Sequence, residues 1–323
     1  MLVLVTGATG FLGTRLVNLL VESGKRVRVL GRNHAALEAL RTTYSAQPFE
    51  CDLRDRDVVV EACRNVEQIY HLGALNSAWA PASEYQGVNV EGTQNVLAGC
   101  QEHGVGRIIF ASTLSVIMDS GSHSALPEPI PYPAKPVSML AQTKRQAEEL
   151  ILGAEGVSSI ILRLARVYGP GDPHFLPPLI ALAQAGKLKQ IGSGRNRAEL
   201  LYRDNAAHAL MQAGTVEATG AYIVTGGEAT YPWSVLRGWL GQLGVPTELP
   251  TTSLNAALVQ ARLNELVATA TGQLPGLSRE QVLWLGQSHT YDDSATMQAL
   301  DYTPPVTQNE GIARTMHALS LRK

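Results

Sequence analysis

The sequence is poor in cysteine, in aromatic residues and in net charge, and it contains no long apolar run. The three cysteines, Cys51, Cys63 and Cys100, are far apart and form no CxxC pair, which is typical of reduced structural thiols and argues against a disulfide framework or a metal site. A net charge of −2 gives no reason to expect nucleic acid or an anionic membrane as a partner. No run of about 18 apolar residues occurs, and the chain begins directly with a strand pattern, so we predict neither a membrane span nor a signal peptide. We therefore expect a cytoplasmic protein that acts on a small molecule.

A glycine-rich turn near the N-terminus is the most informative feature that is present. An apolar run at 2–6 is followed by Gly7, Gly10 and Gly13, and a helical pattern covers 11–23. A strand, a tight turn and a helix N-terminus together form a binding site for a pyrophosphate, because the first helical N–H groups are unpaired and carry partial positive charge. The residues of this turn that we expect to bind the cofactor are Gly7, Thr9, Gly10, Phe11, Leu12 and Gly13.

Strand and helix patterns alternate through the first half of the chain, which predicts a Rossmann-type α/β fold with a doubly wound parallel sheet. The expected strands are at 2–6, 26–30, 49–51, 67–72, 107–111 and 159–164, and the expected helices are at 11–23, 35–41, 56–64, 85–103 and 137–153. Residues 1–167 should form the dinucleotide-binding domain, with later segments near 200–230 returning to it. Residues 168–323 should form mainly a smaller substrate-binding cap, with a helix at 254–271. The proline-rich and serine-rich stretch at 120–136 is predicted to be a loop over the site.

The end of the second strand bears on the choice between NAD and NADP. Gly31 stands where an acidic residue would bind both ribose hydroxyls, and Arg32 follows directly. A guanidinium suits a 2′-phosphate, so we predict NADP rather than NAD. Asn33 and Leu53 are expected to contact the cofactor on this side. Asp52 either accepts a hydrogen bond from the adenine amino group or caps the next helix.

Taken together, the motifs resemble the extended short-chain dehydrogenase/reductases of the epimerase/dehydratase superfamily. Within that group the chain is most similar to the 3β-hydroxysteroid dehydrogenase-like branch, which includes bacterial reductases of 3-oxo acyl chains. The motifs are Thr-Gly-Ala-Thr-Gly-Phe-Leu-Gly at 6–13, His-Leu-Gly-Ala at 71–74, Asn-Val-Glu-Gly-Thr-Gln-Asn-Val at 89–96, Ala-Ser-Thr-Leu-Ser-Val at 111–116, Lys144 with Ala147 and Glu148, and Val-Tyr-Gly-Pro-Gly-Asp at 167–172. The resemblance implies that Thr113 binds the substrate oxygen and Lys144 the nicotinamide ribose, and that Gly73 and Ala74 contact the cofactor.

One residue of the family pattern is absent. The resemblance implies a tyrosine four residues before Lys144 that exchanges a proton with the substrate, but Leu140 occupies that position. A leucine has no proton to give. The candidates for a replacement are Tyr132, Tyr168, Ser115 or a water held by Thr113 and Lys144.

Four interpretations of the missing tyrosine remain open. The chain is a reductase of a carbonyl with a non-standard proton donor, a non-redox enzyme such as an isomerase, cyclase or lyase, a catalytically silent NADP-binding regulator, or an enzyme carrying a deliberate substitution. We favour the reductase, because hydride transfer is the cofactor's own chemistry. The substrate is expected to be an apolar ketone or 3-oxo compound, and a homodimer through 89–103 and 138–153 is the family habit. The cleft is expected to be lined by Trp79, Met139, Leu140, Tyr168 and Phe175.

Overall fold

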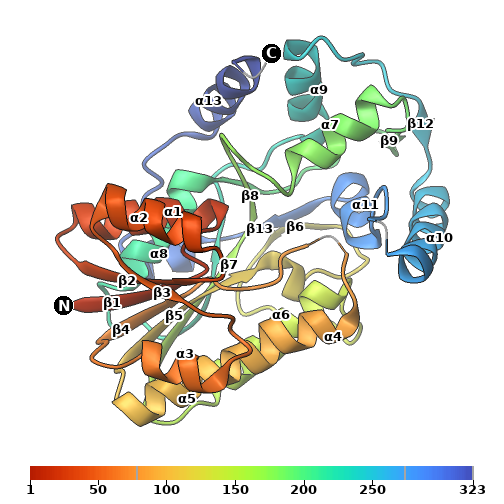
Figure 1. Ribbon diagram of the computed structural model, residues 1–323. Helices are drawn as coiled ribbons and strands as arrows, with labels where there is room; N and C mark the ends of the chain where they lie inside the picture. The colour runs from red at the N-terminus through yellow and green to blue at the C-terminus, as the bar shows by residue number, and fades with distance from the viewer. Residues whose placement is uncertain (78, 273, 322–323) are drawn as a thin grey trace.

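A seven-stranded parallel sheet forms the centre of the protein, in a computed structural model that describes residues 1–77, 79–272 and 274–321 (Figure 1). The strand order is β11-β7-β5-β4-β1-β2-β3, and every pair in it is parallel. The order reverses between β1 and β4, the kind of switch point at which such sheets bind ligands. The predicted Rossmann-type fold is therefore confirmed. The strands are β1 (Leu2–Thr6), β2 (Arg26–Gly31), β3 (Gln47–Glu50), β4 (Gln68–His71), β5 (Arg107–Thr113), β7 (Ser158–Leu164) and β11 (Gly220–Val224).

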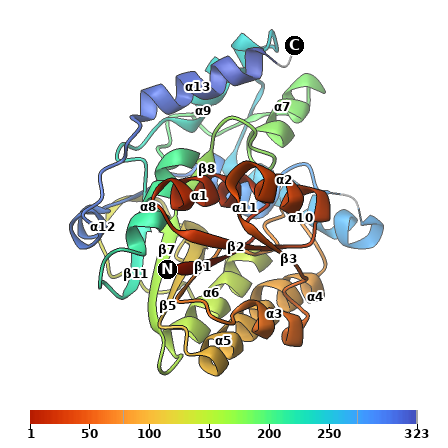
Figure 2. The same cartoon turned by 60° about the vertical axis from the view of Figure 1, so that its left-hand side comes forward.

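Helices cover both faces of this sheet, which explains why its central strands β1 and β4 are buried along their whole length (Figures 1 and 2). All five residues of β1 are buried. On one face lie α1 (Phe11–Glu22), α2 (His34–Tyr44) and α8 (Arg203–Ala213). On the other face lie α3 (Arg56–Ala62), α5 (Gly92–His103) and α6 (Met139–Leu152).

Part of the second half of the chain, which we call the cap, has a core separate from those of the sheet. Trp233 and Trp239 are fully buried there, together with Leu200 and Leu240. Figure 1 shows α10 and α11 beyond the end of the sheet that lies opposite the N-terminus. The cap elements are β8 (Arg166–Tyr168), α7 (Leu176–Gln184), β9 (Gln190–Ile191), β10 (Leu200–Tyr202), α9 (Pro232–Gln242), β12 (Thr251–Thr252), α10 (Leu254–Thr271), α11 (Arg279–Gly286) and α13 (Gln308–Ser320).

Segments near 200–230 lie against the first domain: α8 packs on α1, and β11 extends the central sheet beside β7. Two local predictions need correction. The single helix expected at 85–103 is α4 (Ala82–Tyr85), a π-helical turn (Gln86–Glu91) and α5, because Asn89 turns inward and bonds to Leu75 and Thr143. The loop expected at 120–136 contains β6 (His123–Leu126), which pairs with β13 (His289–Tyr291).

The cysteines are structural residues of the interior. All three cysteines are buried and free, and burial raises the pKa of Cys51 to about 11 and those of Cys63 and Cys100 to about 12. Such thiols are poor nucleophiles, because little thiolate forms near neutral pH.

Among the described residues, none of the helices combines the length and apolarity that a bilayer crossing requires.

Candidate active site

A cleft of about 570 Å³ opens at the carboxyl ends of the sheet strands and runs from the glycine turn to α11 of the cap. Its size is typical of small-molecule and cofactor sites. Asn33 does not line this cleft; it lies in an adjoining hollow with Thr9, Arg32 and His34, where its side chain caps α2. The other residues expected to contact the cofactor all line the cleft: Gly7, Thr9, Gly10, Phe11, Leu12, Gly13, Arg32, Asp52, Leu53, Gly73, Ala74 and Lys144.

The glycine turn leaves the start of α1 open to a ligand. Gly7 has a φ of 66°, in the left-handed region, and its carbonyl accepts the N–H of Gly10 at 3.0 Å. A Cβ at Gly13 would lie 2.2 Å from the Gly7 carbonyl oxygen, so only glycine allows helix and turn to pack this closely. No side chain caps α1 and no acidic residue lies in its first turn. Its first N–H groups are therefore suited to an anion.

Arg32 and Asp52 lie side by side where β2 and β3 end. The Arg32 Nη1 to Asp52 Oδ2 distance is 3.6 Å, whereas Arg54 Nη2 approaches the same oxygen to 2.8 Å. The bond from Arg54 lowers the pKa of Asp52 to about 2, so this carboxylate is ionised and already paired. The Arg32 side chain is 67% exposed at the cleft mouth, and its guanidinium is available to a ligand.

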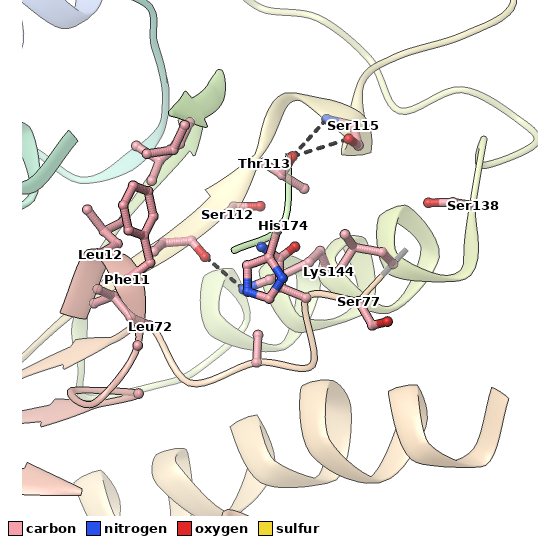
Figure 3. Close-up of a pocket in the computed structure, with 18 of the residues that line it drawn as sticks. Phe11, Leu12, Leu72, Ser77, Ser112, Thr113, Ser115, Ser138, Lys144 and His174 are labelled. Carbon is pink, nitrogen blue, oxygen red and sulfur yellow. Dashed lines mark hydrogen bonds between the residues drawn. The ribbon is translucent and has the colours of Figure 1, made fainter. Parts of the chain in front are cut away.

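Lys144 and Thr113 reach the same part of the cleft from α6 and from the end of β5 (Figure 3). Lys144 is buried, donates to the Ala111 carbonyl at 2.8 Å and lies 4.4 Å from the centre of the Phe110 ring. Burial lowers the pKa of Lys144 to about 8, against the opposing effect of the Glu148 carboxylate. The Thr113 hydroxyl donates to Ser115 Oγ at 3.2 Å.

The two tyrosines among the candidate proton donors, Tyr132 and Tyr168, do not line this cleft. The Tyr132 hydroxyl donates to Glu148 Oε2 at 2.7 Å beneath the site, and burial raises its pKa to about 12. Tyr168 is fully buried in the cap core, where its hydroxyl donates to the Gln308 carbonyl at 3.3 Å. Neither residue belongs to the cleft lining, whereas Leu140 does.

The apolar walls of the cleft are largely those expected from the sequence. Trp79, Met139, Leu140 and Phe175 line it, but Tyr168 does not. The structure adds Trp284 of α11, whose ring contacts Phe175 edge-on with ring centres 5.2 Å apart.

Glu280 is a polar residue of the cleft that the sequence did not indicate. It lies in the first turn of α11 and is 8% exposed. Its carboxylate accepts hydrogen bonds from Ser115 Oγ at 2.7 Å, from Ser138 Oγ at 2.6 Å and from Arg166 Nη2 at 3.2 Å. The sequence Ser-Arg-Glu-Gln at 278–281 predicts a capped helix start, but nothing in it indicates that the glutamate faces residues more than 100 positions away.

Known proteins resemble this chain along almost its whole length. Residues 4–216 match the model of the 3-beta hydroxysteroid dehydrogenase/isomerase family. The 3beta-hydroxysteroid-dehydrogenase/decarboxylase isoform 2 of Arabidopsis thaliana is 33% identical over 98% of this chain, which spans 61% of that longer protein. The 2-alkyl-3-oxoalkanoate reductase of Stenotrophomonas maltophilia is 32% identical over 97% of this chain and 98% of its own length. The structure of MoeE5 in complex with UDP-glucuronic acid and NAD superposes with a TM-score of 0.71 at 26% identity, covering 99% of each chain.

Proposed function

The chain belongs to the 3-beta hydroxysteroid dehydrogenase/isomerase family, and on this premise we propose that it is an NADP-dependent oxidoreductase that reduces the carbonyl of an apolar small molecule. The observation that carries the proposal is the meeting of three features in one cleft. The uncapped N-terminus of α1, the buried Lys144 and the Thr113 hydroxyl all line it. A site for the cofactor's pyrophosphate, a cation and a hydroxyl therefore lie within one enclosed space.

The residues present fit a nicotinamide dinucleotide. The pyrophosphate would lie on the N–H groups of the first helical residues, Phe11 to Gly13. The turn before them needs glycine at position 7, because a Cβ there would lie 2.8 Å from the backbone nitrogen of Gly73. Lys144 would hold the nicotinamide ribose. The cofactor, when bound, supplies the hydride. Thr113 would bind and orient the substrate oxygen.

The preference for NADP follows from the charge at the cleft mouth. Gly31 puts no carboxylate where a 2′-phosphate would lie, and a Cβ there would press on Thr9 Oγ1 at 3.2 Å. Asp52, the nearby acid, is held by Arg54. The exposed Arg32 guanidinium would bind the phosphate with charge-assisted hydrogen bonds.

The substrate class follows from the walls of the cleft together with one relative. Met139, Leu140, Phe175 and Trp284 present apolar surface near Thr113 and Lys144. One relative that matches this chain over nearly the whole of both lengths is named a 2-alkyl-3-oxoalkanoate reductase. We therefore propose a 3-oxo compound with an alkyl body.

A turnover assay tests this function. Purified protein is mixed with NADPH or NADH and with 2-alkyl-3-oxoalkanoates of different chain lengths, and cofactor oxidation is followed by absorbance. We expect oxidation of NADPH and a product heavier than the substrate by two hydrogens. An isomerised or dehydrated product would replace the reductase with a non-redox enzyme. Tight NADPH binding without any product would indicate a regulator.

A further inference from the structure

We propose that Glu280 carries the reaction proton in place of the missing tyrosine, through the hydroxyls of Ser115 and Thr113. The proposal rests on the proposed function and adds to it the route of the proton. Glu280 acts through the two hydroxyls and does not itself touch the substrate.

The carboxylate of Glu280 is positioned by the start of α11. The Ser278 and Gln281 side chains form a reciprocal capping box that anchors the start of α11. This anchoring directs Glu280 onto Ser138, which is the N-cap of α6. Ser138 stands two residues before Leu140, at the helix start from which the family's tyrosine would project. The carboxylate therefore bonds to the residue two positions before Leu140 and lines the same cleft as Leu140.

The direction of the hydrogen bonds follows from the charge of the carboxylate. An ionised carboxylate can only accept, so Ser115 must donate its hydroxyl proton to Glu280 Oε1, 2.7 Å away. The Ser115 oxygen is then free to accept the Thr113 hydroxyl at 3.2 Å (Figure 3). The Thr113 oxygen accepts the Ser115 N–H at 3.2 Å and keeps a second lone pair for the substrate hydroxyl. The hydroxyls thus form an unbroken path from the cleft to Glu280.

Two further side chains, Arg166 and Tyr85, lie near Glu280 in the cleft. Arg166 is held between Phe175 and Trp284 and contacts the carboxylate from β8. Tyr85 also lines the cleft, but its hydroxyl donates to the Ser77 carbonyl at 2.6 Å. Burial, together with the charge of Glu280, raises the pKa of Tyr85 to about 12. Tyr85 is therefore a poor proton donor, and Glu280 is the titratable group joined to Thr113 by hydrogen bonds.

Each proton transfer in the relay has a donor and an acceptor. In reduction, the cofactor's hydride adds to the carbonyl carbon and the C=O π bond breaks. The carbonyl oxygen takes the Thr113 proton, Thr113 takes the Ser115 proton, and Ser115 takes the proton of a protonated Glu280. This leaves Glu280 as a carboxylate, and a proton from water restores its protonated form for the next turnover. In alcohol oxidation every transfer runs backwards, and the hydrogen bonds of the structure are oriented for that direction.

The variants Glu280→Gln and Ser115→Ala test the relay with the substrate identified by the turnover assay. Each should lower kcat by roughly 100-fold, the scale of general acid–base catalysis, with KM and the NADPH Kd changed by less than about threefold. The double variant should lose no more than either single one, because both interrupt one path. Glu310→Gln, which alters an exposed ion pair with Arg314 on α13, is the matched control. A kcat of Glu280→Gln within about threefold of the unmodified protein would overturn the proposal.

Restoring the tyrosine separates a relay from a merely structural role. Glu280→Gln combined with Leu140→Tyr should regain at least about tenfold in kcat, because the phenol supplies a second proton route. If Glu280 only fastens α11 to the first domain, the added tyrosine restores nothing, and that result would count against the relay.

A spectroscopic measurement keeps the proposal testable if no compound of the panel is reduced and the proposed function fails. Infrared difference spectra of the NADPH complex during acid titration should show the carbonyl band of a protonated carboxyl that is absent in Glu280→Gln. The unmodified protein and Glu280→Gln are compared over the pH range in which both remain folded. If their spectra are the same throughout, Glu280 takes up no proton, and the relay is excluded independently of the reductase assignment.

Discussion

Arg32 is the residue through which the cleft would distinguish two cofactors that differ by one phosphate. Its guanidinium is paired only loosely with Asp52, at 3.6 Å, and most of its side chain is exposed. A phosphate could therefore accept hydrogen bonds from the Arg32 guanidinium without breaking a short ion pair.

We predict that Arg32→Ala raises the Kd for NADPH by roughly 10- to 100-fold, the loss expected for hydrogen bonds to a charged group, and changes the Kd for NADH by less than about twofold. Fluorescence titration with both reduced cofactors measures this. Arg26→Ala, an exposed arginine at the start of β2, is the control. An equal loss for NADPH and NADH would show that Arg32 does not contact a 2′-phosphate.

Lys144 is a second residue whose replacement tests cofactor binding, and it should affect NADPH and NADH alike. Its ammonium is held by the Ala111 carbonyl and by the Phe110 ring, so the side chain is already oriented toward the cleft. We predict that Lys144→Ala raises the Kd for both cofactors by about tenfold, because a charge-assisted bond to the ribose is lost. The same titration checks this, with Lys135→Ala as the control. Unchanged affinity would mean that α6 does not contact the ribose.

At the level of elements, the sequence predicts best where periodicity is local. The helix expected at 254–271 is α10 without any shift, and that expected at 11–23 is α1 to within one residue. The strand at 2–6 is β1. In each of these segments the spacing of apolar residues and the residues at the ends indicate the same element. Contacts with distant parts of the chain therefore did not have to override the local preference.

Elements whose positions depend on distant contacts could not be predicted in this way. The π-helical turn at Gln86–Glu91 follows from the bonds of Asn89 to Leu75 and Thr143, the latter 54 residues away. Glu280 reaches Ser115 across 165 residues, and no spacing rule connects them. Tyr168 belongs to the recognisable motif at 167–172, but its side chain points from β8 into the cap core. The glycine turn is a local feature and could be predicted, whereas the proton route is assembled by the cap.

The contact between α1 and the glycine turn gives a prediction at this scale. In Gly13→Ala the added Cβ would lie 2.2 Å from the Gly7 oxygen and 2.8 Å from Ala8 Cα, both backbone atoms that cannot easily move. We expect a loss of about 1–3 kcal/mol in the free energy of unfolding and weaker NADPH binding. Urea unfolding and cofactor titration measure the two effects.

Gly238→Ala is the control for that substitution. Gly238 lies within α9, and a Cβ there would meet no atom within 4 Å. This change should leave the stability equal or raise it by about 0.5–1 kcal/mol, because alanine favours a helix. If Gly13→Ala behaved in the same way, the close approach of α1 to the turn would not be required.

At the scale of the whole molecule, the apolar interior is divided into separate cores, and residues of both the sheet domain and the cap line the cleft. The cap core contains Trp233 and Trp239, and the sheet has apolar clusters on both faces. Polar residues lie between these cores and line the cleft, and burial there changes their protonation. Glu199 precedes β10, is 4% exposed, and its Oε2 has no hydrogen-bond partner within the described part of the chain.

Burial raises the pKa of Glu199 from an ordinary 4.5 to about 7, and this gives the protein a pH-dependent stability. The folded state binds the proton more tightly than the unfolded chain, so the stability from the neutral form is complete below pH 4.5 and is lost as the pH rises through 7. We predict that Glu199→Gln, which mimics the neutral form, gains roughly 2–3 kcal/mol over the unmodified protein on going from pH 5 to pH 8. Urea unfolding at both pH values measures this, with the exposed Glu310→Gln as a variant that should show no such change. A gain of equal size at pH 5 and pH 8 would mean that Glu199 is ionised in the fold throughout this range.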